Sequence, residues 1–343
     1  MHPLGSPIVL APMAGEISTP RLVAAATAGG ALGFLPAGYR SVPELAHDLD
    51  ELRALGVERF GVNVFTPGAD AGEPAQLQEY AQRMLPEAQR LGVAPGRPRA
   101  DDDAYSAKLE LLHDRHGGVV SFTFGCPAAT EVAQLHAAGA EIWVTVTTPE
   151  EALIAQAAGA DALVVQGLEA GGHRGYFNER AEIPDYGLLA LLALVRAACA
   201  LPLVAAGGIA DGAGVAAALC AGAVAAQLGT AFMLTPEAAT APAHRERLRA
   251  TAPTRLTRAF TGRQARGVVN RFMLEHEQHV PHAYPAVHQI TAPIRAAARA
   301  AADPEAINLW AGQAHSLARE VGAEQLVGEL LAQTRAALHA VRV

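Results

Sequence analysis

The chain has 343 residues, of which 51% are hydrophobic and 17% charged, and its formal net charge is −8. This composition excludes global disorder, and the acidic balance argues against nucleic-acid and anionic-membrane partners. Three cysteines are too few for a disulfide framework, and with no basic leader and no run of 18 apolar residues we expect a cytoplasmic protein without a membrane span.

An Ala-rich helical run, a glycine and a short apolar strand recur along the chain, for example in LHAAGAEIWVTV at 135–146 and AQAAGADALVVQG at 155–167. Glycine ends a helix in the left-handed conformation, and the β-branched residues after it favour a strand. The expected strands are Ile8–Ala11, Ala31–Leu35, Phe60–Val64, Val119–Phe124, Glu141–Val146, Ala162–Val165, Leu203–Ala206 and Ala223–Leu228. Eight strands alternating with helices predict an α/β protein with a (β/α)8 TIM barrel; an open doubly wound sheet is the structural alternative.

Helix-start signals follow two of these strands. Ser41 and Glu44 can form a capping box, and Thr148-Pro149-Glu150-Glu151 combines an N-cap, a proline at the first helical position and an acidic third residue. These signals predict helices on the connections that a parallel barrel requires.

Two segments break the rhythm of strand and helix. Residues 67–117, rich in Pro, Gly and Arg, are expected to form an insertion in the third βα unit. Residues 235–343 are expected to form a smaller, mostly helical lid or second domain with closing C-terminal helices, so that the barrel comprises 1–66 and 118–234. Within the insertion, Lys108 and the acidic run Asp101–Asp103 are expected in solvated positions.

The first and third strands end in unusual residues. Ala11, Pro12 and Met13 begin the sequence APMAG, which is either a tight turn or backbone that lies against a flat cofactor. Asn63 is a polar residue within the otherwise apolar strand GVNVF. Its amide would either form a cross-strand hydrogen bond or contact the edge of a heterocyclic ring.

The sixth strand runs into the glycine-rich loop QGLEAGGHRG at 166–175. Glycines around His173 remove side chains, so that a ligand can approach closely. A histidine at the carboxyl end of a barrel strand is a candidate general base, because its pKa ordinarily lies near neutrality. We therefore predict a catalytic role for His173 rather than a purely structural hydrogen bond.

Glycine turns follow the last two strands, Gly207-Gly208 in AAGGIAD and Gly229-Thr230 in QLGTAF. Exposed backbone N–H groups there would form the phosphate site that TIM barrels place after their last two strands, and Asp211 would cap the next helix. Neither glycine turn is followed by the GK[ST] that a Walker A loop requires, and the first strand is not followed by the G-x-G-x-x-G of a Rossmann fold.

The set PIVLAPMAG, GVNVF, QGLEAGGHRG, PLVAAGGIADG and QLGTAF, with TGRQARGVVNRF at 261–272, resembles the nitronate monooxygenase family, formerly called 2-nitropropane dioxygenases. The resemblance implies a TIM barrel with a smaller inserted domain, FMN as cofactor, and oxidation of alkyl nitronates by O2 with His173 as base. It implies cofactor contacts from Ala11, Pro12, Met13, Asn63, Gln166, Gly171, Gly172, Gly207, Gly208, Gln227, Leu228, Gly229 and Thr230. One departure is Thr123, where relatives often have a histidine, and it leaves the fine substrate preference open.

Two other functions stay open. The same motifs resemble FMN-dependent enoyl-acyl carrier protein reductases and a related quinone reductase, which would use NAD(P)H, and a non-catalytic barrel that binds a phosphate ligand is the third hypothesis. The expected partners are a small-molecule substrate and O2, and a homodimer is compatible with the sequence.

Cys126 is interpreted as an apolar filler. The spacing of His276, His279 and His282, interrupted by Pro281, predicts no metal site.

Overall fold

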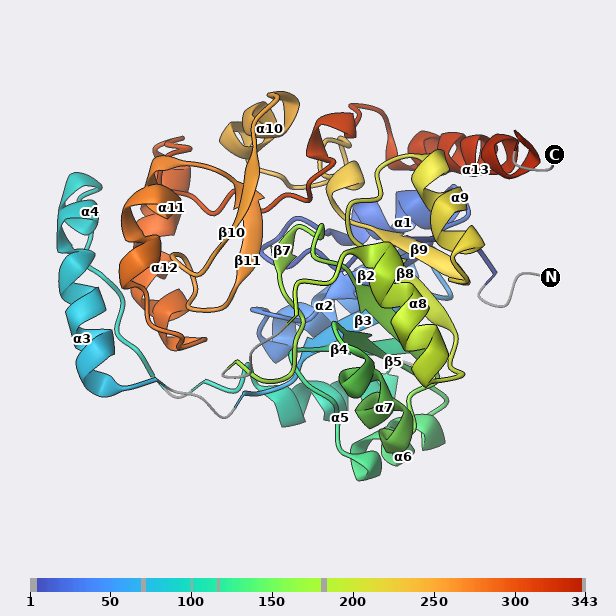
Figure 1. Cartoon of the computed structure of the whole chain (residues 1–343). Helices are drawn as coiled ribbons and strands as arrows, with labels where there is room; N and C mark the ends of the chain where they lie inside the picture. The colour runs from blue at the N-terminus through green and yellow to red at the C-terminus, as the bar shows by residue number, and fades with distance from the viewer. Residues whose placement is uncertain (1–4, 69–71, 100, 116–117, 180–183, 341–343) are drawn as a thin grey trace.

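The computed structural model describes residues 5–68, 72–99, 101–115, 118–179 and 184–340, and its main body is a closed barrel of parallel strands (Figure 1). Around the barrel the strands are β1 (Ile8–Leu10), β2 (Leu32–Pro36), β3 (Gly61–Phe65), β4 (Val119–Thr123), β5 (Glu141–Val146), β6 (Ala162–Gln166), β8 (Leu203–Ala206) and β9 (Ala225–Leu228). β9 pairs with β1 and closes the barrel, with Gln227 opposite Val9. The prediction of a TIM barrel is confirmed and the open sheet is wrong; each strand lies within two residues of its expected bounds.

Helices cover the outside of the barrel. They are α1 (Pro20–Ala28), α2 (Val42–Ala54), α5 (Tyr105–Arg115), α6 (Ala129–Ala137), α7 (Pro149–Ala158), α8 (Leu188–Ala198), α9 (Gly212–Cys220) and α13 (Ala323–Ala340). The expected start signals are confirmed: Ser41 and Glu44 form a capping box on α2, Thr148 caps α7, and Asp211 caps α9.

Strand alternation decides which side chains face the barrel interior. Val9, Phe34 and Trp143 form part of a buried apolar cluster inside the barrel, whereas their strand neighbours face the surrounding helices. Further along β3 and β6, the same inward alternation brings Asn63 and Gln166 to the carboxyl end of the barrel. Successive residues of a strand point to opposite faces. Asn63 and Gln166 therefore lie inside the barrel, above the buried apolar cluster.

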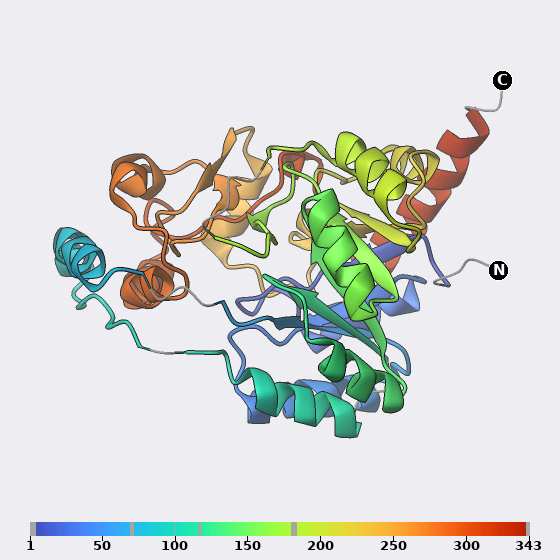
Figure 2. The same cartoon turned by 60° about the horizontal axis from the view of Figure 1, so that its bottom comes forward.

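A smaller domain lies beside the carboxyl ends of the barrel strands. Its elements are α3 (Pro74–Arg83), α4 (Leu85–Arg90), α10 (Pro242–Arg249), α11 (Arg271–His276), α12 (Ala286–Ala300) and the strands β10 (Thr254–Thr257) and β11 (Ala265–Val268). Both views show α3 and α4 beside α12 (Figures 1 and 2), and buried side chains of the three helices share one apolar cluster. The short 3₁₀ turns in the described part of the chain are Thr230–Phe232, Glu277–His279 and His315–Leu317.

A three-stranded antiparallel sheet joins the two bodies. β7 (Gly172–His173), in the loop after β6, pairs with β11 of the smaller domain, and His173 lies opposite Ala265. The expected non-barrel segments 67–117 and 235–343 each contain one helix of the barrel ring, because α5 packs against α2 and α6, and α13 packs against α9 and α1.

The environment of Lys108 corrects the expectation of a solvated position. Its side chain is fully buried on α5, and its Nζ lies 2.8 Å from Asp103 Oδ2. Asp103 Oδ1 also accepts a hydrogen bond from the backbone N–H of Tyr39, 3.0 Å away, which holds Tyr39 at a left-handed φ of 65°. Asp101 and Asp102 are exposed, so only the last residue of the acidic run departs from the prediction.

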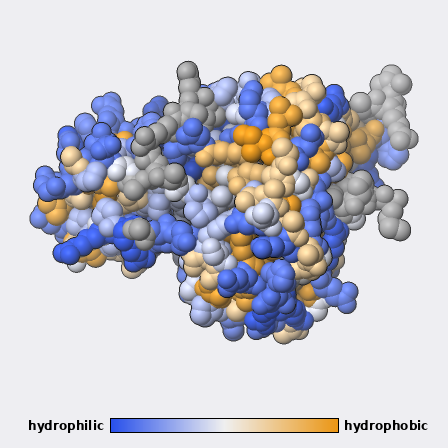
Figure 3. Space-filling view, turned by 90° about the horizontal axis from the view of Figure 1, so that it is seen from below, coloured by the Kyte–Doolittle hydropathy of each residue, from blue (hydrophilic) through white to orange (hydrophobic). Residues whose placement is uncertain are grey.

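None of the described helices combines the length and apolarity that crossing a membrane requires. In the face drawn in Figure 3, the barrel side carries more apolar surface than the side of the smaller domain. On the barrel, α7 exposes Leu153 and Ile154, and α8 exposes Leu189 and Leu194.

Candidate active site

A cavity of about 730 Å³ lies over the carboxyl ends of the barrel strands and reaches α12 of the smaller domain. Its size lies within the range of roughly 300–1,000 Å³ that is usual for small-molecule sites. Every cofactor or catalytic residue expected from the sequence lines it, except Leu228. Strand alternation turns the Leu228 side chain outward into the core between barrel and helices, where it is 1% exposed, and the expected cofactor contact of this residue stays a prediction.

Backbone donors form one end of the cavity floor. Gly207 and Gly208 adopt φ values of 122° and 69°, which residues with a side chain rarely adopt. Within the described ranges, the N–H groups of Gly208, Gly229 and Thr230 have no protein acceptor. Free N–H groups gathered on adjacent loops are suited to an anion such as a phosphate.

The segment Ala11–Met13 forms a wall of the cavity and leads into a turn at residues 14–17. Ser18 Oγ accepts a hydrogen bond from Met13 N at 3.0 Å and donates one to Ala11 O at 3.1 Å. The two readings of this segment are therefore compatible, since the segment that leads into the turn presents rigid backbone to whatever occupies the cavity.

Asn63 makes the cross-strand contact that the sequence allowed. Its Nδ2 donates to Ser121 Oγ at 2.9 Å and to Thr123 Oγ1 at 3.0 Å. Oδ1 has no partner among the described residues and is left as an acceptor at the cavity. Thr123, the position of the expected departure from the family, thus helps to orient Asn63, and it also contacts Thr145 Oγ1 at 3.2 Å.

Gln166 holds the loop that carries His173. Its Nε2 donates to His173 O at 2.9 Å, and its Oε1 accepts from Gly175 N at 2.8 Å. Both ends of the amide are thus used by the protein. Gly171 is required by close packing, because a Cβ there would lie 2.5 Å from Gly312 N. A Cβ at Gly172 would meet no atom within 4 Å, but Gly172 has a left-handed φ of 76°.

The hydrogen bonds of His173 fix its tautomer. His173 Nε2 lies 2.9 Å from Thr261 Oγ1, and the Thr261 hydroxyl donates its single proton to Arg263 O, 3.1 Å away. Thr261 Oγ1 must therefore accept from His173, which places the imidazole proton on Nε2. Nδ1 has no partner in the described part of the chain, so its lone pair is open to the cavity.

The charge state of His173 follows from its surroundings. Burial lowers its pKa to about 3, and the nearby guanidinium groups of Arg263 and Arg295 act in the same direction. Rings of Phe124, Tyr284 and Trp310 lie 5.5–5.7 Å from the imidazole, centroid to centroid. His173 is consequently neutral at physiological pH.

The roof of the cavity comes from residues that the sequence motifs did not identify. Tyr39, His288, Arg295 and Trp310 line it. The rings of Tyr39 and His288 stack with centroids 4.5 Å apart and an interplanar angle of 7°. A usable signal was present: His288 and Arg295 are seven residues apart on a helix whose buried face is otherwise largely apolar, which places both toward the same side.

Arg295 is buried without a carboxylate partner. Its side chain is 4% exposed and donates to Thr291 Oγ1, Asn308 Oδ1 and His288. Burial lowers its pKa to about 10, which still leaves it charged at neutral pH. The roof therefore carries a positive charge that no described acidic side chain neutralises by an ion pair.

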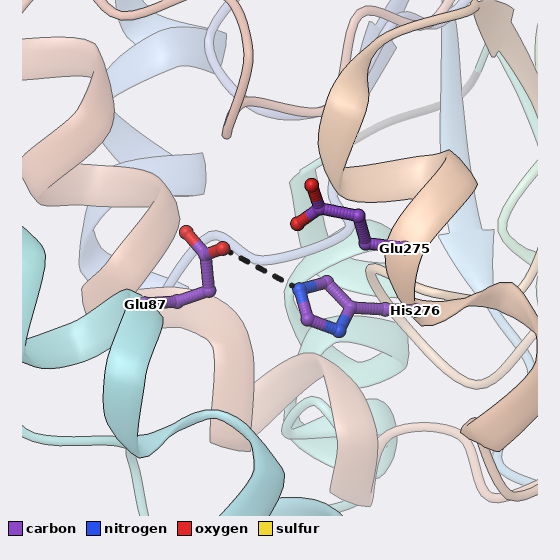
Figure 4. Close-up of side chains that lie close together, drawn as sticks. All are labelled: Glu87, Glu275 and His276. Carbon is purple, nitrogen blue, oxygen red and sulfur yellow. Dashed lines mark ion pairs between the residues drawn. The ribbon is translucent and has the colours of Figure 1, made fainter.

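The histidine-rich segment lies away from the cavity. His276 Nε2 lies 3.5 Å from Glu87 Oε1, with Glu275 close by (Figure 4). Arg271 Nη1 already lies 2.5 Å from both carboxylates, and Arg90 contacts Glu87 at 3.2 Å. The group is thus an ion-pair network that joins α4 to α11.

Cys126 lies near the carboxyl end of β4 and is half-buried. Burial raises the pKa of its thiol to about 11, so the thiol stays protonated at neutral pH. Because the thiolate is the reactive form, this environment agrees with the interpretation of Cys126 as an apolar filler.

Comparisons with known proteins point to one family. The family model for nitronate monooxygenase matches residues 3–333. The chain is 39% identical to the nitronate monooxygenase of Pseudomonas aeruginosa, with 96% of each chain covered, and 37% identical to that of Paraburkholderia phytofirmans, with 99% of this chain and 95% of the relative covered.

Solved structures add the fold. A nitroalkane oxidase from Streptomyces ansochromogenes is 48% identical, with a TM-score of 0.94 over 99% of this chain and 98% of that one. FabK from Thermotoga maritima, at 24% identity and a TM-score of 0.78 over 99% and 96% of the two chains, shares the fold.

Proposed function

The chain belongs to the nitronate monooxygenase family and is an oxidoreductase, and from this premise we propose that it uses FMN to oxidise alkyl nitronates with O2. The observation that carries the proposal is the open Nδ1 of His173 in a cavity whose floor offers free backbone N–H groups. One end of this cavity suits a phosphate, and the other presents an acceptor to a substrate.

The floor fits FMN on three counts. Free N–H groups of Gly208, Gly229 and Thr230 would hold the phosphate. The backbone of Ala11–Met13 offers a surface to a flat ring, and Asn63 Oδ1 offers an acceptor to its edge. The redox chemistry, which takes electrons from the nitronate and delivers them to O2, would be supplied by FMN.

His173 would act on the proton that distinguishes a nitroalkane from its nitronate. Its Nδ1 lone pair can accept the α-proton of a bound nitroalkane, while Thr261 keeps the other ring nitrogen protonated. A pKa of about 3 makes His173 a weak proton acceptor. The site therefore favours nitronates that have already lost the proton.

Replacing His173 by Asn tests this role. We expect turnover of a neutral nitroalkane to fall by about 10²-fold, the low end for a general base, and turnover of the preformed nitronate to fall much less. Oxygen uptake with both forms of one substrate measures the two losses. Equal losses on both forms would contradict the assignment of His173 as base.

The NAD(P)H-dependent alternatives differ in their reductant. Anaerobic mixing of the purified holoprotein with NADH, NADPH or a nitronate, followed by the visible spectrum, identifies which of them bleaches the flavin. The proposal requires bleaching by the nitronate. Bleaching by NADH or NADPH alone would support a reductase, and a protein that binds FMN but is bleached by none of them would support a binding role.

The homodimer stays a prediction, which sedimentation equilibrium tests. The exposed apolar residues Ile154 on α7 and Leu189 on α8 lie on the surface that a second copy would cover in such a dimer. Charged substitutions at these two positions would dissociate such a dimer.

A further inference from the structure

We propose that His288 is a second substrate-binding residue, which donates a hydrogen bond from Nε2 to an oxygen of the nitro or nitronate group. This inference rests on the proposed function and adds a residue from α12 of the smaller domain. It gives the cavity two imidazoles of opposite polarity, an acceptor at His173 and a donor at His288.

The tautomer of His288 follows from its neighbour. Arg295 Nη2 lies 3.1 Å from His288 Nδ1 and 3.0 Å from His288 O. A guanidinium can only donate, so Nδ1 must accept and the single imidazole proton lies on Nε2. Protonation of both nitrogens would turn an N–H toward the guanidinium, and the pKa of His288 is accordingly lowered, first by burial and then by Arg295.

The donor is free and faces the cavity. His288 lines the same cavity as His173, and its Nε2 has no partner in the described ranges. Tyr284 lies between the two histidines, with ring centroids 5.7 Å from His173 and 6.3 Å from His288. Both imidazoles thus pack against the same tyrosine, and both line the cavity that would hold the substrate.

The ring of His288 is also held in orientation. It stacks on Tyr39, whose backbone is fixed by Asp103, and the Tyr39 hydroxyl lies 3.0 Å from that of Tyr284. A donor that is fixed before the substrate arrives loses little freedom on binding, which is the condition under which such donors stabilise developing charge best.

The chemistry balances with these two groups. When a nitroalkane loses its α-proton to His173 Nδ1, the C–H electron pair becomes the C=N bond and one N=O pair moves onto oxygen. The negative charge therefore appears on the nitro oxygens, where the Nε2–H of His288 can donate. A preformed nitronate carries the same charge from the start, so His288 serves both forms of the substrate.

The test replaces His288 by Phe in the FMN-loaded enzyme, because Phe keeps a ring to stack on Tyr39 and removes the donor. We expect kcat/KM to fall by about 10²-fold on both nitroalkane and nitronate. His288→Gln, which retains an N–H donor and an acceptor for Arg295, should recover part of the loss. His279→Phe, the same change at an exposed position outside the cavity, is the matched control.

A second measurement does not depend on turnover. Nitrate is a planar anion that can occupy the place of a nitronate but cannot be oxidised by the enzyme. Its binding can be followed by the flavin spectrum. We expect His288→Phe to weaken nitrate binding by about 10-fold at unchanged FMN content. In the wild type, two-bond ¹H–¹⁵N spectra should show His288 protonated at Nε2, with this nitrogen shifting on addition of nitrate.

The outcomes separate the two proposals. If the wild type oxidises nitronates and His288→Phe matches it on both substrates and on nitrate, the role of His288 is overturned and the proposed function stands. If the wild type oxidises no nitronate, the proposed function fails, and the nitrate and NMR measurements still decide the donor. An Nδ1-protonated His288 in the wild type overturns the inference without any substitution.

Discussion

The floor and the roof of the cavity are built by different means. The floor consists of strand ends and glycine turns of the barrel, where the backbone N–H groups of Gly208 and Gly229 are free to bind a ligand. The roof consists of side chains, His288 and Arg295 on α12, that no barrel motif contains. The difference teaches that a short motif can specify a site made of backbone, whereas a site made of side chains depends on where a distant helix docks.

The largest expected effect concerns the floor. Gly208→Asp would place a carboxylate at the proposed phosphate position, and two like charges about 4 Å apart repel by about 4 kcal/mol at an effective dielectric near 20. FMN affinity, measured by quenching of flavin fluorescence, should fall by at least about 10²-fold.

Gly208→Ala is the control for strain. Gly208 has a φ of 69°, and a Cβ there would meet Glu169 Cβ at 2.9 Å, so any side chain disturbs the turn. Only the additional loss in the Asp variant reports the charge. Equal affinities of the two variants for FMN would place the phosphate elsewhere.

The second effect concerns the Lys108–Asp103 ion pair, which holds the roof residue Tyr39 in place. Lys108→Met removes the cation that neutralises Asp103, whose carboxylate holds Tyr39 against His288. Loss of one partner of a buried pair should lower the free energy of unfolding by about 3 kcal/mol. Denaturant unfolding measures it, and the double variant with Asp103→Asn should recover part of the loss; a single variant as stable as the wild type would show that the pair contributes nothing.

The same pair marks a limit of the sequence. Glycine caps, apolar strands and the Ser41 capping box are local signals, and each predicted its element because the physics acts over a few residues. Lys108 lies on an amphipathic helix with charged neighbours, and its burial depends on Asp103 turning toward it, which no local pattern encodes. Leu228, by contrast, was predictable: alternation from the inward Gln227 turns it outward.

The candidate site divides in the same way. Asn63 was predicted because a polar residue within an apolar strand is unusual, and His173 because it stands on a glycine-rich loop at a strand end, whatever lies opposite them. The partner of His173, Thr261, is 88 residues away and became visible only when β11 paired with β7. His288 belongs to no short motif, and the denser histidines that precede it in the sequence lie outside the cavity.

A third, smaller effect concerns the hydrogen bond from His173 to Thr261, which fixes the tautomer of the imidazole. Thr261→Val removes the oxygen that accepts from Nε2, so both tautomers become accessible. We expect kcat/KM on a neutral nitroalkane to fall by about 10-fold, the low end for losing the outer partner of a functional histidine. Thr261→Ser should behave as the wild type, and a Ser variant as impaired as Val would point to packing instead.

The smallest effect is an absence of titration. Burial and the charges of Arg263 and Arg295 lower the pKa of His173 to about 3, so it takes up a proton only as the pH falls toward that value. Its ring-proton chemical shift, assigned by comparison with His173→Asn, should be flat from pH 5 to 8. An inflection near the ordinary pKa of about 6.5 would show that the roof leaves the imidazole solvated.

The smaller domain is assembled from two separate excursions of the chain, one carrying α3 and α4 and the other carrying α10–α12. It cannot be exchanged as one contiguous gene segment without cutting the barrel twice. Substrate preference is more readily altered through α12 alone, which presents His288, Ala292, Arg295, Ala296 and Arg299 to the cavity at helical spacing. Substitutions at a few positions of one helix can therefore diversify the roof during evolution while the floor is inherited unchanged.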